Sequence, residues 1–348
     1  MDKKPFLYIF ISAALFGVSS PVAKLLLKDI SPIALAGLLY LGAFLGLFLY
    51  SLLTSRITPV TEGEKLRKKD FHWLAGAIAA GGVMAPICQM LGLNLISGFS
   101  VSLLLNLEGV TTAVIAVLFF RENSGRRLWL AVLCMTAAGV FLSWSPEQGT
   151  FNVVGPLLIL LAVVSWGIDN NLTRRISDKS PIQITYIKGL VGGIISLSVA
   201  LVLGKAITFD IAILFALLLG SLSYGLSLVF FIKALKGLGS SRTGAFFSLG
   251  PFIGALVSIV VLRDWVGWIM VPAFLLMALG IWLIVGERHA HAHVHAAVTH
   301  THSHKHDDMH HLHWHPEPIK GLHSHEHVHA ELSHVHSHWP DIDHRHAH

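Results

Sequence analysis

Two acidic residues lie inside long apolar stretches, where a charged side chain is costly to bury. Glu108 is near the centre of the stretch 98–120, and Asp169 lies past the middle of 153–173. A charge at the centre of a membrane helix costs about 2.5–3.5 kcal/mol on insertion scales, so it usually faces a cavity or a partner. Such a carboxylate could carry a proton, bind a cation or gate a passage. Glu108 could instead be a protonated carboxyl bonded to a neighbouring helix, and Asp169 could pair with Arg174 or reach the membrane interface.

Polar residues around these carboxylates extend the candidate site. Lys188 lies about two turns into the stretch 182–204. We expect it to be a counter-ion to Glu108 or Asp169, or a docking point for a carboxylate, unless it snorkels to the membrane surface. Gln89 and Arg242 are further candidates for the cavity wall. Gln89 could instead form a hydrogen bond between two helices, and Arg242 could instead be an anchor at the membrane interface. The candidate cavity residues are Glu108, Asp169, Asn170, Asn171, Lys188, Ser19, Ser20, Gln89 and Arg242.

The C-terminal segment 289–348 has a different chemistry, because it holds all but one of the 23 histidines; the exception is His72. Many of these histidines alternate with other residues, and alternate side chains of an extended backbone lie on one side. Neutral imidazole is a good ligand for Zn, Ni and Co. No cofactor is required, but we expect divalent transition metal to bind the tail; the alternative is a solvated, pH-responsive polar segment. The candidate metal ligands are His289, His291, His293, His295, His300, His302, His304, His306, His310, His311, His313, His315, His323, His325, His327 and His329.

The elements that must position these side chains are membrane helices. Hydrophobic residues make up 53% of the chain and charged residues only 13%, which is too few charges for an ordinary soluble protein. Apolar stretches of about 20 residues cross a bilayer as helices, because lipid offers backbone groups no partner. The sequence therefore predicts an all-α polytopic membrane protein followed by a disordered His-rich tail. Ten spans are predicted, near 5–27, 32–54, 71–93, 98–120, 128–145, 153–173, 182–204, 209–232, 243–262 and 266–286.

The loops indicate an orientation. If the N-terminus is cytoplasmic, most basic loop residues fall on the cytoplasmic side, and only Lys24, Lys28, Lys205 and Arg263 fall on the other. The positive-inside rule then predicts that both termini, and hence the tail, are cytoplasmic. We expect an integral protein of a bacterial inner membrane. Its first span is too long for the apolar region of a signal peptide and is retained as structure.

The chain also repeats itself. Residues 15–32 align with 165–181, and 107–125 align with 249–267. Each copy holds five predicted spans, and an odd number means that the second copy enters the membrane inverted, as in secondary transporters. The predicted units are a first repeat 1–145, an inverted second repeat 146–288 and the tail 289–348. Within the repeats, the spacings Gly42-x-x-x-Gly46 and Gly250-x-x-x-Gly254 predict close helix packing rather than chemistry.

These motifs resemble a known family. The stretches LLLNLEGVTTAVIAVLFFRE at 103–122 and SSRTGAFFSLGPFIGALVSIVVLRD at 240–264, with the aromatic-Gly pairs Phe16-Gly17 and Trp166-Gly167, resemble EamA-type permeases of the drug/metabolite transporter superfamily. The likeness covers about residues 5–286. It implies a carrier of small metabolites, amino acids or drugs with a central cavity between its halves. Where many members have Glu-Pro, this chain has Glu108-Gly109, which puts a proline-dependent kink there in doubt.

Several function classes are excluded or left open. The chain has no phosphate-binding G-x-x-x-x-G-K-[ST] loop and no cluster of nucleophile and base, so neither an ATP-driven pump nor an enzyme is expected. Its expected partners are a small-molecule or ion substrate and the lipid bilayer, with no nucleic acid, and a homodimer is left open. We favour a permease, expected to be an exporter, of a small metabolite, amino acid or amine. Export of Zn, Ni or Co and a membrane-anchored metal buffer or accessory protein are the alternatives.

Overall fold

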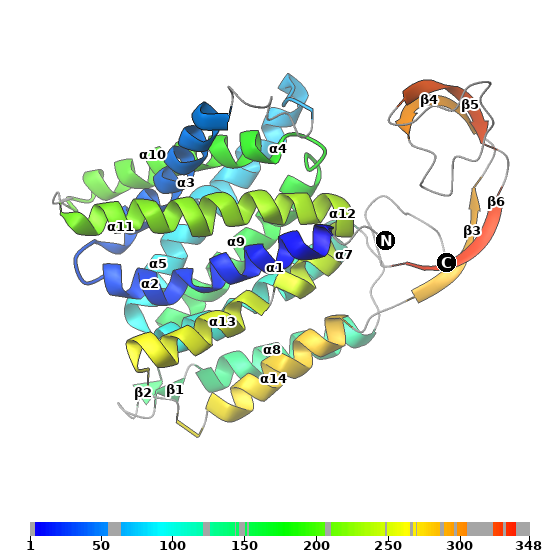
Figure 1. Ribbon diagram of the computed structural model, residues 1–348. Coiled ribbons are helices and arrows are strands. Elements are labelled where there is room, and N and C mark those ends of the chain that lie inside the picture. Colours follow the sequence, from blue (N-terminus) through cyan, green and yellow to red (C-terminus); the bar gives the residue numbers. More distant parts are fainter. Residues whose placement is uncertain are drawn as a thin grey trace. The chain divides into compact units, whose positions relative to one another are not determined.

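The computed structural model describes a helical unit and, as a separate unit, a stretch of strands from the tail (Figure 1). The described residues are 4–54, 64–120, 126–142, 144–145, 150–151, 153–205, 210–247, 249–264, 267–268, 270–285, 289–295, 298–304, 323–329 and 332–338.

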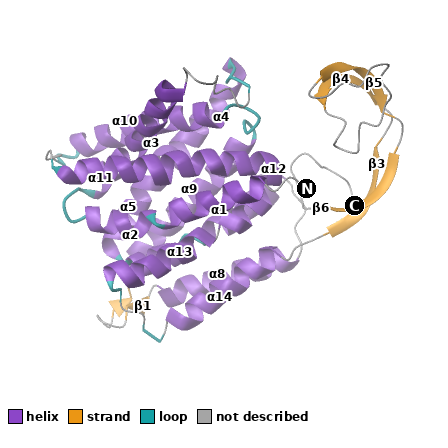
Figure 2. Cartoon of the chain, in the orientation of Figure 1, coloured by secondary structure: helices purple, strands orange, loops and turns teal. Residues whose placement is uncertain are grey.

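Helices make up almost all of the first unit, as Figure 2 shows. The α-helices of the first repeat are α1 (Lys4–Gly17), α2 (Ser19–Leu26), α3 (Pro32–Thr54), α4 (Phe71–Ala77), α5 (Ala85–Leu95), α6 (Gly98–Leu104), α7 (Leu107–Phe120) and α8 (Arg126–Leu142). Those of the second are α9 (Val154–Arg174), α10 (Pro181–Val202), α11 (Ile211–Leu219), α12 (Ser227–Phe247), α13 (Leu249–Val257) and α14 (Met270–Val285). The shorter elements are the 3₁₀ turn η1 (Lys68–Asp70), the π-helical η2 (Ile78–Met84), η3 (Gly220–Leu226) and η4 (Ser258–Leu262), and the strands β1 (Trp144–Ser145) and β2 (Thr150–Phe151).

Seven of the helical segments in the described residues are long and apolar enough to cross a membrane. They are Lys4–Leu26, Pro32–Leu52, Lys68–Leu95, Gly98–Phe119, Val154–Arg174, Pro181–Val202 and Ile211–Lys236. Three shorter apolar helices, Trp129–Ala138, Leu249–Leu262 and Val271–Leu283, occupy the places of the remaining predicted spans. The prediction of membrane helices is confirmed for the seven, and the number ten stays a prediction.

Equivalent helices of the two repeats pack against each other. In the described part of the chain α3 lies against α10, and α8 lies against α14. Glycines allow the close approaches that the sequence predicted. A methyl group at Gly42 would collide with the backbone oxygen of Leu217, and one at Gly250 would lie 2.6 Å from that of Ala13. The packing interpretation of the two Gly-x-x-x-Gly motifs is therefore confirmed.

Two π-helical segments interrupt equivalent spans. The segments η2 (Ile78–Met84) and η3 (Gly220–Leu226) start 142 residues apart (220 − 78), which is also the offset between the aligned stretches 107–125 and 249–267. Segments of this kind are rare and occur frequently at functional sites. Both carry small residues, such as Gly81 and Ser223, so a neighbouring helix or a polar side chain can approach the backbone closely.

The tail unit spans Arg288–Trp339, and its described residues form four strands. In antiparallel pairs, β3 (His289–His295) joins β6 (Leu332–His338), and β4 (Val298–His304) joins β5 (His323–His329). The sequence predicted a disordered tail, and that stays a prediction; the structure describes these strands within it. Histidine alternates there with Ala, Thr, Val, Ser or Glu, which is the two-residue period of a strand. Histidine stands opposite histidine in both registers, as at His291 and His336 or His302 and His325.

Candidate transport cavity

A partly open cavity of about 40 Å³ lies inside the helical unit. Both repeats contribute to its wall: α1, α3 and α7 from the first, and α9, η3 and α12 from the second. Six of the lining residues are aromatic and two are acidic. The lining residues are Phe16, Tyr40, Glu108, Trp166, Asp169, Asn170, Ser223, Tyr224, Ser227, Leu228, Phe231 and Phe247.

Asp169 forms a buried ion pair in this wall. The Lys188 ammonium on α10 lies 2.7 Å and 2.6 Å from the two carboxylate oxygens of Asp169 on α9. The Thr173 hydroxyl donates a third hydrogen bond to the carboxylate at 2.9 Å. Only 1% of the Lys188 side chain and 5% of the Asp169 side chain are exposed. The structure thus places Lys188 beside Asp169 and away from the surface, and the cation beside Asp169 is not Arg174.

Glu108 is surrounded differently. It accepts a hydrogen bond of 2.9 Å from the Asn170 amide, which also donates to Thr112 at 3.2 Å. The carboxyl is buried, and within the described residues no lysine, arginine or histidine forms an ion pair with it. Its side chain lies in the first turn of α7, where the helix dipole favours a negative charge. The helix is interrupted between α6 and α7. Gly109 stands where many members of the resembled family have proline, so this helix break does not require a proline ring.

The tyrosines of the wall are fixed by hydrogen bonds that reach behind it. The Tyr224 hydroxyl donates to Gln89 at 2.8 Å, and the Gln89 amide donates to Ser20 at 3.2 Å. The Tyr40 hydroxyl donates to the carbonyl of Gly81, in the π-helical η2. Gln89 and Ser20 therefore support the wall, although neither lines the cavity.

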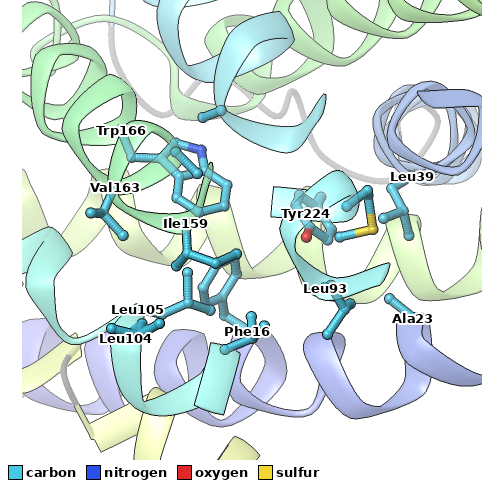
Figure 3. Packing of buried hydrophobic residues seen from close by; sticks show 14 of the residues in the cluster. Phe16, Ala23, Leu39, Leu93, Leu104, Leu105, Ile159, Val163, Trp166 and Tyr224 are labelled. Atoms are coloured by element: carbon cyan, nitrogen blue, oxygen red, sulfur yellow. The ribbon is translucent and has the colours of Figure 1, made fainter. Parts of the chain in front are cut away.

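Aromatic rings pack against one another around one side of the cavity. The centroid of the Phe16 ring lies 5.7 Å from that of Trp166 and 5.1 Å from that of Phe247. The rings of Phe231 and Phe247 are 4.9 Å apart. Figure 3 shows Phe16, Trp166 and Tyr224 within this buried packing. The two aromatic-Gly motifs of the repeats therefore meet at one place, because Phe16 and Trp166 are their aromatic members.

The other predicted site residues lie elsewhere. Asn171 joins α9 to α7 by donating to the carbonyl of Thr112 at 3.0 Å, and Ser19 is buried without lining the cavity. Arg242 falls in α12, but its side chain is outside the described residues. Of the predicted metal ligands, His306, His310, His311, His313 and His315 lie outside the described residues, and the other eleven belong to β3, β4 and β5.

Sequence reasoning missed several residues of the wall. Ser223 and Ser227, four residues apart in an apolar span, lie on one helical face, and this spacing could have revealed them. The aromatic residues Tyr40, Phe231 and Phe247 carry no such signal, because a ring in a membrane helix is usually ordinary packing. They are assigned to the cavity only by the folded structure, in which α3, α9 and α12 all contribute residues to its wall.

Charged residues also connect elements that do not line the cavity, and one of these contacts joins the two repeats. The Lys24 ammonium on α2 donates to the carbonyls of Leu93 at 2.5 Å and Ile96 at 3.0 Å, at the end of α5. Asp264, after η4, accepts from the backbone amide of Phe99 at 2.9 Å, in the first turn of α6. These contacts attach α2 and the end of η4 to the two sides of the turn between α5 and α6.

A second connection joins the loop before α4 to the loop before α10. The Lys179 ammonium lies 2.6 Å from Asp178 and 2.8 Å from Glu64, and the backbone amide of Ser180 donates to the Glu64 carbonyl at 2.9 Å. The hydrogen bond from Lys179 lowers the pKa of Glu64. The hydrogen bonds to Asp178 and Glu64 raise the pKa of Lys179.

The described residues contain no group of three or more His, Cys, Asp or Glu side chains placed to hold a metal ion. The side chains of the tail strands are not among those described, so this finding concerns the helical unit. Within the described part of that unit, the two carboxylates of the cavity contact the Lys188 ammonium, the Thr173 hydroxyl and the Asn170 amide.

Comparison with known proteins gives one consistent answer. The model of the EamA-like transporter family matches residues 3–144 and again residues 153–286, one match for each repeat. A protein of Methanothermobacter thermautotrophicus described as an uncharacterized transporter is 27% identical over 277 residues, covering 74% of this chain and 79% of that protein. The uncharacterized transporter YyaM of Bacillus subtilis is 26% identical over 220 residues, covering 58% of this chain and 70% of YyaM.

A solved crystal structure also has this fold. It aligns with a TM-score of 0.58 at 16% sequence identity, covering 79% of this chain and 94% of the other. The likeness concerns the fold alone at this level of identity.

Proposed function

Because the chain belongs to the EamA-like transporter family, we propose that it is a secondary transporter, working as an exporter, whose two repeats are inverted around the central cavity. The proposed cargo is a small organic solute that binds in this cavity. Glu108 is the group whose charge changes during the cycle, and Asp169 with Lys188 forms a fixed, internally neutral part of the wall.

One observation carries this assignment. Glu108 is a buried carboxyl in a cavity wall without an ion-pair partner among the described residues, whereas Asp169 beside it has one. An isolated carboxylate is unfavourable in a low-dielectric site, so it must take up a proton or a cation that enters the cavity. A group that alternates between two such states couples the contents of the cavity to the proton or cation supply.

For the tail we propose binding of divalent transition metal on the cytoplasmic side. This proposal rests on the alternation of histidines and on the strand registers that place histidine opposite histidine. Neutral imidazoles on neighbouring strands suit Zn, Ni or Co. The proposed role is to bind or sense metal, while the organic solute uses the cavity.

Transport by purified protein in liposomes tests the assignment. Uptake of amines, amino acids, Zn²⁺, Ni²⁺ and Co²⁺ is measured with and without a pH gradient, for the wild type, Glu108→Gln and Asp29→Asn. Asp29 is an exposed carboxylate after α2 and serves as the matched control. We expect flux of an organic solute that Glu108→Gln abolishes and Asp29→Asn retains. Unchanged flux in Glu108→Gln would refute the role of Glu108, and flux of metal alone would favour metal export.

A further inference from the structure

The charges of the cavity wall restrict the solutes that it can hold. None of the described lining residues is a lysine or arginine, and the acidic ones are Glu108 and Asp169. Asp169 is already neutralised, because both of its oxygens lie within 2.7 Å of the Lys188 ammonium. The wall therefore offers an entering solute one negative charge, that of Glu108, and no positive one.

Anionic groups fit this wall poorly. Lys188, the cation that pairs with Asp169 of the wall, is fully buried, so a carboxylate on the solute could reach it only by displacing a buried partner. Removing one partner of a buried ion pair is strongly unfavourable. A carboxylate or phosphate on the solute would also lie next to Glu108 in a low-dielectric space. This argues against organic anions, and it argues against zwitterions such as amino acids.

The rest of the wall suits an apolar cation. Its six aromatic residues are Phe16, Tyr40, Trp166, Tyr224, Phe231 and Phe247. Ring faces attract cations, indole most strongly, and the same rings give contact to an apolar body. The tyrosine hydroxyls already donate to Gln89 and to the Gly81 carbonyl, and the Asn170 amide donates to Glu108 and Thr112. Few polar groups remain to replace the water shell of a strongly hydrated solute or of a bare metal ion.

We propose that the substrate is an organic cation with an apolar body, bound by charge to Glu108 and by the aromatic wall, foremost Trp166. This inference rests on the proposed function, because it assumes that the central cavity is the transport site. It narrows the substrate from small organic solutes in general to those with a single positive charge and no anionic group.

Binding to the purified full-length protein tests the class of substrate directly. Benzyltrimethylammonium supplies a fixed positive charge, 3-phenylpropionate a negative one and phenylalanine both, on similar aromatic bodies. Isothermal titration should detect benzyltrimethylammonium and give much weaker binding of the other two. Glu108→Gln should weaken cation binding by about thirtyfold or more, as expected for loss of a buried charge partner. Asp29→Asn should leave it unchanged.

The aromatic part of the proposal has its own variants. Trp166→Phe keeps a ring face and should retain most of the affinity, whereas Trp166→Leu should weaken binding of the cation roughly 3- to 30-fold. The matched control is Phe252→Leu, because Phe252 packs edge to face on Phe274 at 5.1 Å and does not line the cavity. Equal losses for Trp166→Leu and Phe252→Leu would overturn a specific role for the ring.

The outcomes separate the two levels of the proposal. If phenylalanine or 3-phenylpropionate binds and is transported in a Glu108-dependent manner while the cation does not bind, the substrate class is wrong and the proposed function stands. If the cation binds equally well to wild type and Glu108→Gln, the site is wrong and both fall. Failure of benzyltrimethylammonium to bind the folded wild type also overturns the substrate class.

Discussion

Glu108 and Asp169 are both carboxylates buried in apolar helices, yet their surroundings give them different roles. Asp169 is held by Lys188 and Thr173. Among the described residues, the partner of the Glu108 carboxyl is the neutral amide of Asn170. Sequence reasoning selected both carboxylates and Lys188 because charges are rare at such depth. It could not decide which of the two carboxylates Lys188 would meet, since that depends on how α10 packs against α9.

The Asp169–Lys188 pair should behave as one unit. Asp169→Asn and Lys188→Met each leave an unpaired buried charge, so each should lower the free energy of unfolding by about 3–5 kcal/mol. The double variant leaves no charge and should lose less than either single variant. Reversible unfolding in mixed micelles, combined as a double-mutant cycle, measures the coupling. Losses that simply add would contradict the pairing.

At the scale of elements, small residues set how closely the helices approach. Gly42→Ala would push a methyl group into the backbone of Leu217 and should destabilise the fold by about 1–3 kcal/mol. At Gly244 a methyl group would meet its nearest neighbour, the Cα of Gly109, at 3.7 Å. Gly244→Ala should therefore be neutral or stabilising by up to about 1 kcal/mol, as a better helix former. Unfolding of both variants in micelles checks the contrast, and equal effects would count against the packing.

The loop contact around Glu64 should depend on pH. The hydrogen bond from Lys179 lowers the pKa of Glu64. A carboxyl whose pKa is lowered stabilises its contact fully at pH values above its ordinary pKa. This stabilisation is lost as the pH falls through the lowered pKa. Hydrogen exchange at the Ser180 amide, corrected for its intrinsic rate, should therefore accelerate on acidification. Glu64→Gln should be faster at neutral pH and lose most of this dependence. The same pH profile in wild type and Glu64→Gln would contradict the assignment.

Elements were only partly predictable. Apolar length predicted the seven long spans, and the alignment of the chain with itself predicted the repeats. The break after Leu105 and the π-helical segments at Ile78–Met84 and Gly220–Leu226 were not predicted. A hydropathy pattern indicates that a stretch is helical. A π-helical turn contains only one residue more than an α-helical turn, which leaves the hydropathy pattern almost unchanged.

At the scale of the whole molecule, the body and the tail are proposed to have separable tasks. Deleting residues 289–348 should abolish binding of Zn²⁺, Ni²⁺ and Co²⁺ while flux of the organic solute persists. In the full-length protein, metal should be released as the pH falls through about 6.5, because protonated imidazole does not ligate. Titration calorimetry on both forms measures this. Metal binding that survives the deletion would place the ligands in the helical unit instead.

The central claim is that the cavity is a passage reached from both sides of the membrane. It is tested most directly by Ser223→Cys, introduced after Cys88 and Cys134 have been replaced by alanine, with Ser196→Cys as the control because Ser196 is buried away from the cavity. A membrane-impermeant maleimide is applied to sealed vesicles from each side. Cys at position 223 should react from both sides and be protected by bound solute, whereas Cys at position 196 should not react. Reaction at position 223 from one side only, or from neither, would contradict the claim.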